Sequence, residues 1–193
     1  MTDHKYGVAN DPYCYPSSTV LKNKLNIRSQ LKLDAAERQL TGIRFEEALP
    51  RGTFDVAHYG SIHRHLFQDI FAWAGEFREI RIDKDASMFC YPEFIAREMD
   101  SLFMRLKPDV IETTLPRQDF AKKASLFLAD LNAIHPFREG NGRTQLAFLK
   151  LLSEQVGHPL NLKTFSPERL LAAMIASFRG DVAALEVEIL GEQ

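Results

Sequence analysis

Apolar residues recur at helical spacing along most of this chain, and this periodicity constrains its fold more than any other feature. Between about Thr19 and Leu49, residues such as Leu33, Ala36 and Leu40 follow one another at steps of three and four, with charged residues between them. The same spacing predicts further helices over about 55–74, 92–106, 119–134 and 143–156, one that begins at Ser166-Pro167, and a last one over about 181–190. The sequence therefore predicts an all-α fold.

One segment shows the alternation that is typical of a β-strand. Arg78 to Ile82 reads Arg, Glu, Ile, Arg, Ile, a polar stretch follows over 83–87, and Met88 to Tyr91 is mostly apolar again. We expect a short β-hairpin over about 78–91. It adds a small sheet element to an otherwise helical domain.

The domain organisation follows from length and turn residues. A chain of 193 residues is expected to form a single domain, here residues 1–193. Residues 1–18 are rich in Pro, Gly, Asn and Ser with tyrosines among them, which predicts an ordered arm rather than a helix or strand.

Composition excludes several classes of protein. Lys+Arg 24 against Asp+Glu 26 gives a net charge of −2, so neither a basic nucleic-acid arm nor a long acidic tail dominates. No apolar run reaches the roughly 18–20 residues that span a bilayer, and the first residues lack the apolar core of a secretory signal. The only cysteines, Cys14 and Cys90, indicate a reducing cytosol. We therefore expect a cytoplasmic protein without direct nucleic-acid or membrane binding.

The stretch from 135 to 143 concentrates the chemistry of the chain. It reads as a helix end, a tight loop and a new helix start. Gly140-Asn141-Gly142 can bring backbone N–H groups close to a ligand at the positive end of a helix dipole, where phosphates bind. A cation is disfavoured at that end, so Arg143 in the first turn indicates an anionic partner that it can contact in a bidentate way.

Two further side chains complete a phosphate-transfer site. Glu139 would repel phosphate unless a cation came between them, and Mg²⁺ bound by one carboxylate plus phosphate oxygens resolves that conflict. His135 is the candidate for a base near neutral pH. Alone, a histidine before a proline is a helix end and Gly-Asn-Gly is a turn. Their combination within nine positions favours phosphate-ester chemistry.

These nine residues, His135 to Arg143, resemble the signature HPFx[DE]GNGR of the Fic family, with every fixed position filled. The segment Ile62–Gly75 resembles the family's stretch before its flap, and Asn10–Tyr13 resembles the opening of small bacterial members that act as toxins. The resemblance implies a Fic fold, in which a helical core carries a β-hairpin flap over the active site.

The resemblance also implies an activity, the transfer of AMP from ATP to a Tyr, Thr or Ser hydroxyl of a target protein with release of pyrophosphate. On this reading His135 accepts the hydroxyl proton and Glu139 holds Mg²⁺ on the α- and β-phosphates. The anion hole consists of Gly140, Asn141 and Gly142, with the Asn141 side chain also reaching a phosphate, while Arg143 binds the triphosphate, Pro136 shapes the loop and Phe137 anchors it.

The hairpin resembles the flap that clamps a target segment by strand addition, with its edge setting the hydroxyl in line with the α-phosphate. The expected docking residues are Ile80, Arg81, Ile82, Asp83, Lys84, Met88 and Phe89.

One position departs from the family pattern. Many adenylylating relatives carry a second arginine three residues after the first, which contacts the terminal phosphate and is the point of inhibition. Here that position is Leu146. The phosphorylating Doc-like branch also tends to lack this arginine, but it has Ala-Asn-Lys in place of Gly-Asn-Gly. AMP transfer is favoured, and phosphotransfer, other nucleotidyl transfer or a non-catalytic interaction module are the alternatives.

Partners are expected from the same resemblance. Small toxin-like relatives modify bacterial type II topoisomerases, which makes such an enzyme the family-level candidate for the target. The family's inhibitory motif [ST]xxx[E][GN] has no clean match, because Ser125 is followed by Asp130 and the tail Glu186-Val187-Glu188 lacks the preceding Ser or Thr. A separate small antitoxin is therefore expected.

Overall fold

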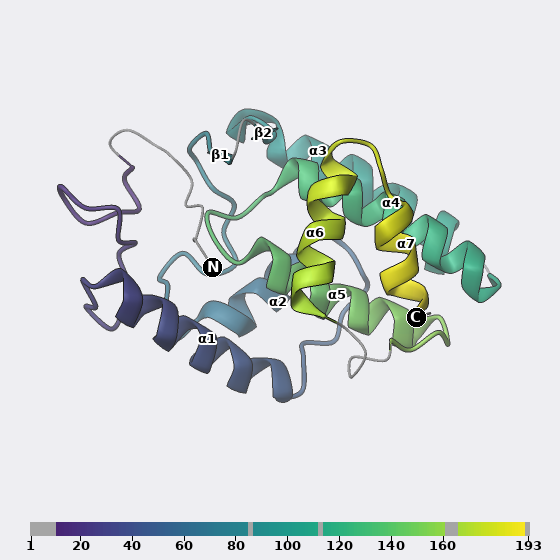
Figure 1. The fold of residues 1–193 in the computed structure, drawn as a ribbon, viewed down its shortest axis with the longest axis horizontal. Coiled ribbons are helices and arrows are strands. Elements are labelled where there is room, and N and C mark those ends of the chain that lie inside the picture. Colours follow the sequence, from purple (N-terminus) through teal and green to yellow (C-terminus); the bar gives the residue numbers. More distant parts are fainter. Residues whose placement is uncertain (1–10, 85–86, 112–113, 161–165, 192–193) are drawn as a thin grey trace.

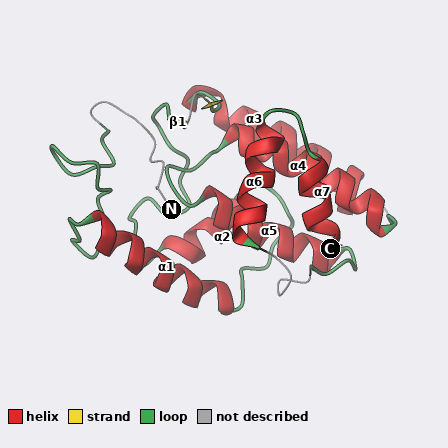
Figure 2. Ribbon diagram, in the orientation of Figure 1, coloured by secondary structure: helices red, strands yellow, loops and turns green. Residues whose placement is uncertain are grey.

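The structure is a computed structural model that describes residues 11–84, 87–111, 114–160 and 166–191 (Figures 1 and 2). Within these ranges helices dominate, as the periodicity predicted. The helices are α1 (Gln30–Glu46), α2 (Val56–Phe67), α3 (Pro92–Leu106), α4 (Arg117–Ile134), α5 (Asn141–Gln155), α6 (Pro167–Phe178) and α7 (Ala183–Leu190), with a π-helical turn at Lys107–Ile111 and two short strands, β1 (Asp83–Lys84) and β2 (Ser87–Met88).

Helix α5 lies at the centre of the fold. It contacts α2 and α4, while α1 packs on α2, α3 packs on α4, and α6 and α7 cover α4 (Figure 1). Phe148 of α5 is fully buried, and its ring lies 5.4–5.8 Å from those of Tyr59, Phe103 and Phe127 on α2, α3 and α4. Complete burial of such a side chain contributes about 1.5–3 kcal/mol. The core therefore fixes the helix whose first residues belong to the predicted catalytic loop.

Several predicted helix boundaries are confirmed by their caps. The Asp55 side chain accepts a hydrogen bond from the His58 N–H at 2.8 Å at the start of α2. Ser166 caps α6, and Pro92 is the first residue of α3. The helix predicted from about residue 119 begins earlier, at Arg117, so Asp119 lies in its first turn, where a negative charge interacts favourably with the helix dipole.

The prediction that a helix runs from about 19 to 49 is wrong in its first part, because α1 begins only at Gln30. The chain doubles back there, and Lys22 N donates to Tyr13 O at 2.7 Å. The Asn23 side chain then accepts from Ile27 N and donates to Ile27 O. Side-chain bonds of this kind compete with helix formation.

The predicted second helix is also too long. It ends at Phe67, and the residues from Gln68 to Gly75 form turns, with Ile70 N bonded to Phe67 O and Gly75 at φ +91°. A left-handed residue ends a helix more readily when it is glycine. Gly75, which directly follows the predicted helix end at 74, therefore marks the end of these turns rather than the end of α2.

The hairpin pairs at its tip and not along the predicted arms. Asp83 pairs with Met88 and Lys84 with Ser87, so three of the four paired residues lie in the polar stretch over 83–87, and residues 78–82 are not strand. The carbonyls of Ile80 and Cys90, one on each arm, both accept hydrogen bonds from the buried Arg78 side chain. The guanidinium thus bonds to both arms in the stretch where the alternation predicted paired strands.

Part of the sequence predictions lies outside the described residues. Residues 1–10 of the expected arm and residues 85–86 of the expected hairpin belong to this part. Cys14 and Cys90 are both free thiols. Among the described residues, no helix combines the length and the apolar character needed to cross a membrane.

Candidate active site

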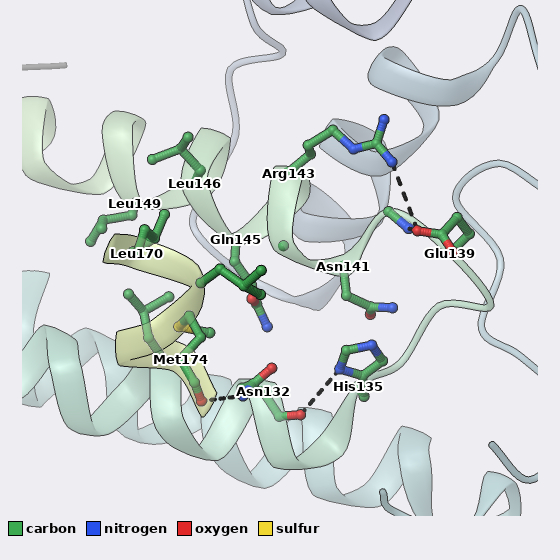
Figure 3. A pocket seen from close by; sticks show the side chains of 14 residues that line it. Asn132, His135, Glu139, Asn141, Arg143, Gln145, Leu146, Leu149, Leu170 and Met174 are labelled. Carbon is green, nitrogen blue, oxygen red and sulfur yellow. Dashed lines mark hydrogen bonds and ion pairs between the residues drawn. The ribbon is translucent and has the colours of Figure 1, made fainter. Parts of the chain in front are cut away.

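A cavity of about 440 Å³ lies between the end of α4, the start of α5 and α6 (Figure 3). His135, Glu139 and Arg143 line one side of it, together with residues 140–142. The opposite side is apolar and consists of Leu128, Leu146, Leu149, Leu170, Leu171 and Met174. The fold therefore brings the chemically active part of the 135–143 stretch to one cavity wall.

His135 is the C-cap of α4 and has left-handed backbone angles, φ 50° and ψ 62°. Such a conformation is uncommon for a residue other than glycine. Its ring Nδ1–H donates to the Asn132 carbonyl at 3.3 Å, and the ring stacks on Phe89 with centroids 3.9 Å apart. With the proton on Nδ1, the lone pair that can accept a further proton is on Nε2. Nε2 is therefore the ring atom that can accept a proton, and 8% of the residue is exposed.

The loop after His135 leads into the N-terminus of α5, where backbone N–H groups can donate to a negatively charged group. Helix α5 begins at Asn141 behind the N-cap Gly140, and the first N–H groups of an α-helix have no acceptor within it. Gly140 N already donates to a carboxylate oxygen of Glu139 at 3.0 Å. A negative group therefore occupies the position where the helix dipole favours one.

The two glycines of the loop serve different purposes. Gly140 has φ +84°, and a Cβ there would lie 2.3 Å from the Phe67 ring. A Cβ on Gly142 would meet no atom within 4 Å. The first glycine is required by backbone geometry and packing, whereas the second one lines the cavity without being sterically required.

Asn141 has a structural role that the sequence did not predict. Its side-chain oxygen accepts from Phe137 N at 3.0 Å, its amide donates to Phe137 O at 2.8 Å, and only 2% of the residue is exposed. Both ends of this side chain therefore close the loop. Its expected contact with a phosphate stays a prediction, and its backbone N–H lies at the helix start.

Arg143 points toward α1. Its guanidinium bonds to Glu37, donates to Thr41 Oγ1 at 3.2 Å and lies 3.7 Å from Glu139 and over the Phe67 ring. Burial raises the pKa of the Glu37 carboxyl, the Arg143 guanidinium opposes that rise, and the Glu139 charge adds to it. Sequence reasoning missed Glu37, since a lone glutamate in a predicted helix carries no signal of a partner about a hundred residues away.

Arg138 and Asp11 form a second pair that the sequence did not reveal. Both Nε and Nη2 of Arg138 donate to one oxygen of Asp11, at 2.9 and 2.6 Å, and each side chain is 5% exposed. The N-terminal arm therefore holds the variable position of the loop motif. In the sequence, the Asp11-Pro12-Tyr13 segment was marked by its resemblance to the toxin-like members. That resemblance did not indicate that Asp11 pairs with Arg138.

His63 supports the loop from behind. Its Nδ1 accepts from Gly75 N at 2.8 Å, and its Nε2–H donates to the Glu139 carbonyl at 3.0 Å. The ring stacks on Phe137, with centroids 3.8 Å apart. Burial lowers the pKa of His63 to about 3, so the ring is neutral. The partner of His63 is thus the backbone of the 135–143 loop, which no pattern in the sequence had indicated.

The predicted docking residues of the hairpin fall into different environments. Phe89 is buried against His135, Ile82 is also buried, and Ile80 is half-buried. Arg81 is exposed and lies over the Tyr91 ring at 4.0 Å. The structure describes the backbone alone for Asp83, Lys84 and Met88.

Comparison with known proteins identifies the family. The sequence pattern of the Fic/DOC family matches residues 53–153. The chain is 50% identical to "Probable protein adenylyltransferase y4lH" of Sinorhizobium fredii (strain NBRC 101917 / NGR234), over 96% of this chain and 97% of that protein. It is 33% identical to "Probable protein adenylyltransferase Fic" of Escherichia coli (strain K12), over 97% of this chain and 94% of that protein.

A solved structure shares the fold. BepC from Bartonella tribocorum, crystallised with bound AMPPNP, matches with a TM-score of 0.84 at 26% identity, over 92% of this chain and 94% of that chain. The family predicted from the loop signature is confirmed by sequence and by structure. The chain belongs to the Fic/DOC family.

Proposed function

We propose that this chain is a protein adenylyltransferase, which transfers AMP from ATP to a hydroxyl side chain of a target protein and releases pyrophosphate. The observation that carries the proposal is the shared cavity wall, where the His135 imidazole lies beside the N-terminus of α5. The relatives named as protein adenylyltransferases, and the AMPPNP bound by BepC, support the same reaction.

In this reaction the target hydroxyl oxygen forms a bond to the α-phosphorus, and the bond from that phosphorus to the bridging oxygen of pyrophosphate breaks. Nε2 of His135 accepts the hydroxyl proton, because Nδ1 is protonated against Asn132. The N–H groups at the start of α5 face the charge of the phosphates. Such transfers depend mainly on positioning and charge neutralisation.

Glu139 fits a magnesium ion. Its side chain is one-third exposed at the cavity, and only one of its oxygens is engaged with Gly140 N. No group of three or more His, Cys, Asp or Glu side chains gathers among the described residues to hold a metal. One carboxylate plus phosphate oxygens is the coordination that Mg²⁺ commonly takes with nucleotides. When bound there, the ion would neutralise phosphate charge, with Arg143 next to it.

The hairpin is proposed as the flap that docks the target. β1 and β2 are two residues long and antiparallel, so their edges can pair with an extended segment. Phe89 connects this element to the imidazole, since its ring stacks on His135. A target segment held on the hairpin would therefore lie close to the base.

The test is incubation of the purified chain with a bacterial lysate, Mg²⁺ and [α-³²P]ATP, followed by mass spectrometry of the labelled protein. The proposal predicts a Tyr, Thr or Ser residue that carries AMP. The His135→Ala variant is the matched control and should give no label while it keeps its fold. Equal labelling by that variant would support the reading as a non-catalytic interaction module.

Phosphotransfer is the second candidate, and Leu146 favours it. This side chain lies on the apolar side of the cavity, at the position where many adenylylating relatives carry an arginine (Figure 3). Parallel reactions with [α-³²P]ATP and [γ-³²P]ATP separate the two activities. Label from the α-position alone indicates adenylylation, and label from the γ-position indicates phosphotransfer.

The wider role is proposed on the family resemblance. We place the reaction in the cytosol, where free thiols such as Cys14 and Cys90 persist. A bacterial type II topoisomerase is the proposed target, and a separate small antitoxin is the proposed inhibitor. Glu188, one of the tail carboxylates, pairs with Arg169 of α6 at 2.8 Å. Tight inactivity of the purified chain, relieved by removal of its C-terminal segment, would contradict a separate antitoxin.

A further inference from the structure

Arg78 lies between Gly75 and β1, and its side chain is buried although it carries a permanent charge. Only 2% of the residue is exposed. Its guanidinium donates four hydrogen bonds to backbone carbonyls, two at the end of α4 and two on the arms of the hairpin. One side chain thus joins two segments that lie more than 40 residues apart in sequence.

Toward α4, Arg78 holds the backbone of the proposed base. Nε donates to the His135 carbonyl at 2.9 Å, and Nη2 donates to the Ile134 carbonyl at 3.2 Å. Its backbone N–H also donates to Pro136 O at 2.9 Å. The last carbonyls of a helix lack partners within it and form its negative end, so a cation is favoured there. These bonds hold the backbone of His135 in its left-handed conformation.

Toward the hairpin, Arg78 holds both arms. Nη1 donates to the Ile80 carbonyl at 2.7 Å, and Nη2 donates to the Cys90 carbonyl at 2.6 Å. Cys90 N in turn donates to Ala133 O at 3.1 Å. The arm that leads back from the hairpin is therefore fixed against the last turn of α4.

These two sets of bonds meet at the imidazole. Phe89, whose ring stacks on His135 at an interplanar angle of 21°, directly precedes Cys90. Arg78 therefore fixes the peptide that carries the imidazole and the peptide next to the ring on which it stacks. Two contacts orient the His135 ring, namely the stacked Phe89 ring and the hydrogen bond from Nδ1 to Asn132 O.

We propose that Arg78 is a positioning residue for the transfer reaction, which couples the hairpin to the orientation of the His135 imidazole. This inference rests on the proposed function, in which His135 is the base and the hairpin docks the target. Arg78 acts through His135 and Phe89. The planar fork of arginine reaches four carbonyls, which a lysine ammonium on a flexible stem does not reproduce.

The test uses Arg78→Lys and Arg78→Gln in the full chain, with Arg105→Gln as the matched control. Arg105 lies on α3, is exposed, and bonds to Asp130 at 3.3 Å. Circular dichroism and thermal unfolding establish that each variant is folded before any other measurement is taken.

The first readout is the ¹⁵N spectrum of the histidine rings, with the His135 signals assigned from His135→Ala. Wild-type protein and Arg105→Gln should show the Nδ1–H tautomer of His135, and both Arg78 variants should show a mixture of tautomers. Identical His135 signals in folded Arg78→Gln and wild-type protein would overturn the inference. This readout needs no substrate, so it decides the inference even if the chain transfers no AMP and the proposed function fails.

The second readout is AMP transfer from [α-³²P]ATP to lysate protein. Arg78→Gln should lower the rate at saturating ATP about 100-fold, as expected when a base is misplaced, and Arg78→Lys should recover little of it. The KM for ATP should stay within about threefold of the wild-type value, because Arg78 is not a residue of the phosphate-binding wall. Rates equal to those of Arg105→Gln would overturn the inference.

A third measurement covers the case in which both Arg78 variants fail to fold. In wild-type protein, a through-hydrogen-bond coupling between Nε of Arg78 and the carbonyl carbon of His135 should be detectable by NMR. Its absence in the folded protein would overturn the inference.

Discussion

The side chain of Asn141 is bonded at both of its ends to the backbone of Phe137, so that one residue closes the 135–143 loop on itself. Phe137 is fully buried and stacks on His63 and Tyr59 of α2. The loop is therefore attached to the core at Phe137. Because Asn141 is the first residue of α5, its two bonds to Phe137 also fix the start of that helix against the core. A buried amide with both partners satisfied is costly to replace.

Asn141→Ala should destabilise the protein by about 2–4 kcal/mol, because two buried backbone groups of Phe137 lose their partners. Asn141→Asp should also destabilise it, because a carboxylate cannot donate to Phe137 O. Urea unfolding measures both effects. If Asn141→Ala kept wild-type stability and lost only activity, the structural role would be contradicted and a phosphate contact favoured.

Gly140→Ala and Gly142→Ala should separate loop geometry from catalysis. At Gly140 the positive φ and the close Phe67 ring should cost about 2–4 kcal/mol of stability. At Gly142 the added methyl meets no atom within 4 Å, so stability should stay within about 1 kcal/mol.

Activity should fall in both glycine variants, since Gly142 lines the cavity proposed to bind the phosphates and its added methyl would narrow that space. Urea unfolding and the transfer assay on the same samples check this. A Gly142→Ala variant with full activity would show that this position tolerates a side chain beside the nucleotide.

His63 should make stability depend on pH. Its pKa is about 3 in the folded chain against an ordinary value of 6.5, so between these values the unfolded chain binds the proton and the folded chain does not. The free energy of unfolding should therefore fall as pH drops below about 6.5, by about 2 kcal/mol at pH 5 from this residue.

His63→Phe keeps an aromatic ring against Phe137 and removes the titrating group. The variant should be less stable than wild type at pH 7, because Gly75 N and Glu139 O lose a partner, but its stability should fall less between pH 7 and pH 5. Urea unfolding at the two pH values measures the difference. An equal fall in both proteins would contradict a neutral, buried His63.

Arg143→Ala should lose stability as well as activity, because it leaves the largely buried Glu37 carboxylate without its cation. The double variant Glu37→Gln/Arg143→Ala should recover much of the stability and none of the activity. A double-mutant cycle in urea provides the coupling energy. If the stability losses simply added, the pair would contribute little, and the lost activity could be assigned to phosphate binding alone.

The sequence predicted the helices well where caps and prolines bound them, as at Asp55, Pro92 and Ser166. It failed where side chains replaced regular backbone bonding. Asn23 closes a turn in place of a helix start, and the Arg78 side chain bonds to both arms of the hairpin where the alternation predicted paired strands. Neither set of hydrogen bonds leaves a periodic pattern in the sequence, because each depends on a single side chain and its backbone partners.

The candidate site was predicted as far as it is local. Residues His135 to Arg143 are contiguous, so their chemistry was readable as a motif. The partners Asp11, Glu37 and His63 come from other segments and became visible only in the folded chain. The grouping of these residues at one cavity was thus predictable, whereas the contacts that hold them in place were not.

The decisive measurement for nucleotide binding at the 135–143 loop is a crystal structure of the protein with Mg²⁺ and AMPPNP. We expect phosphates against the N–H groups at the start of α5, a metal ion on Glu139, and Nε2 of His135 facing the α-phosphate. A nucleotide bound elsewhere with this loop empty, or an imidazole turned away from the phosphates, would contradict this expectation.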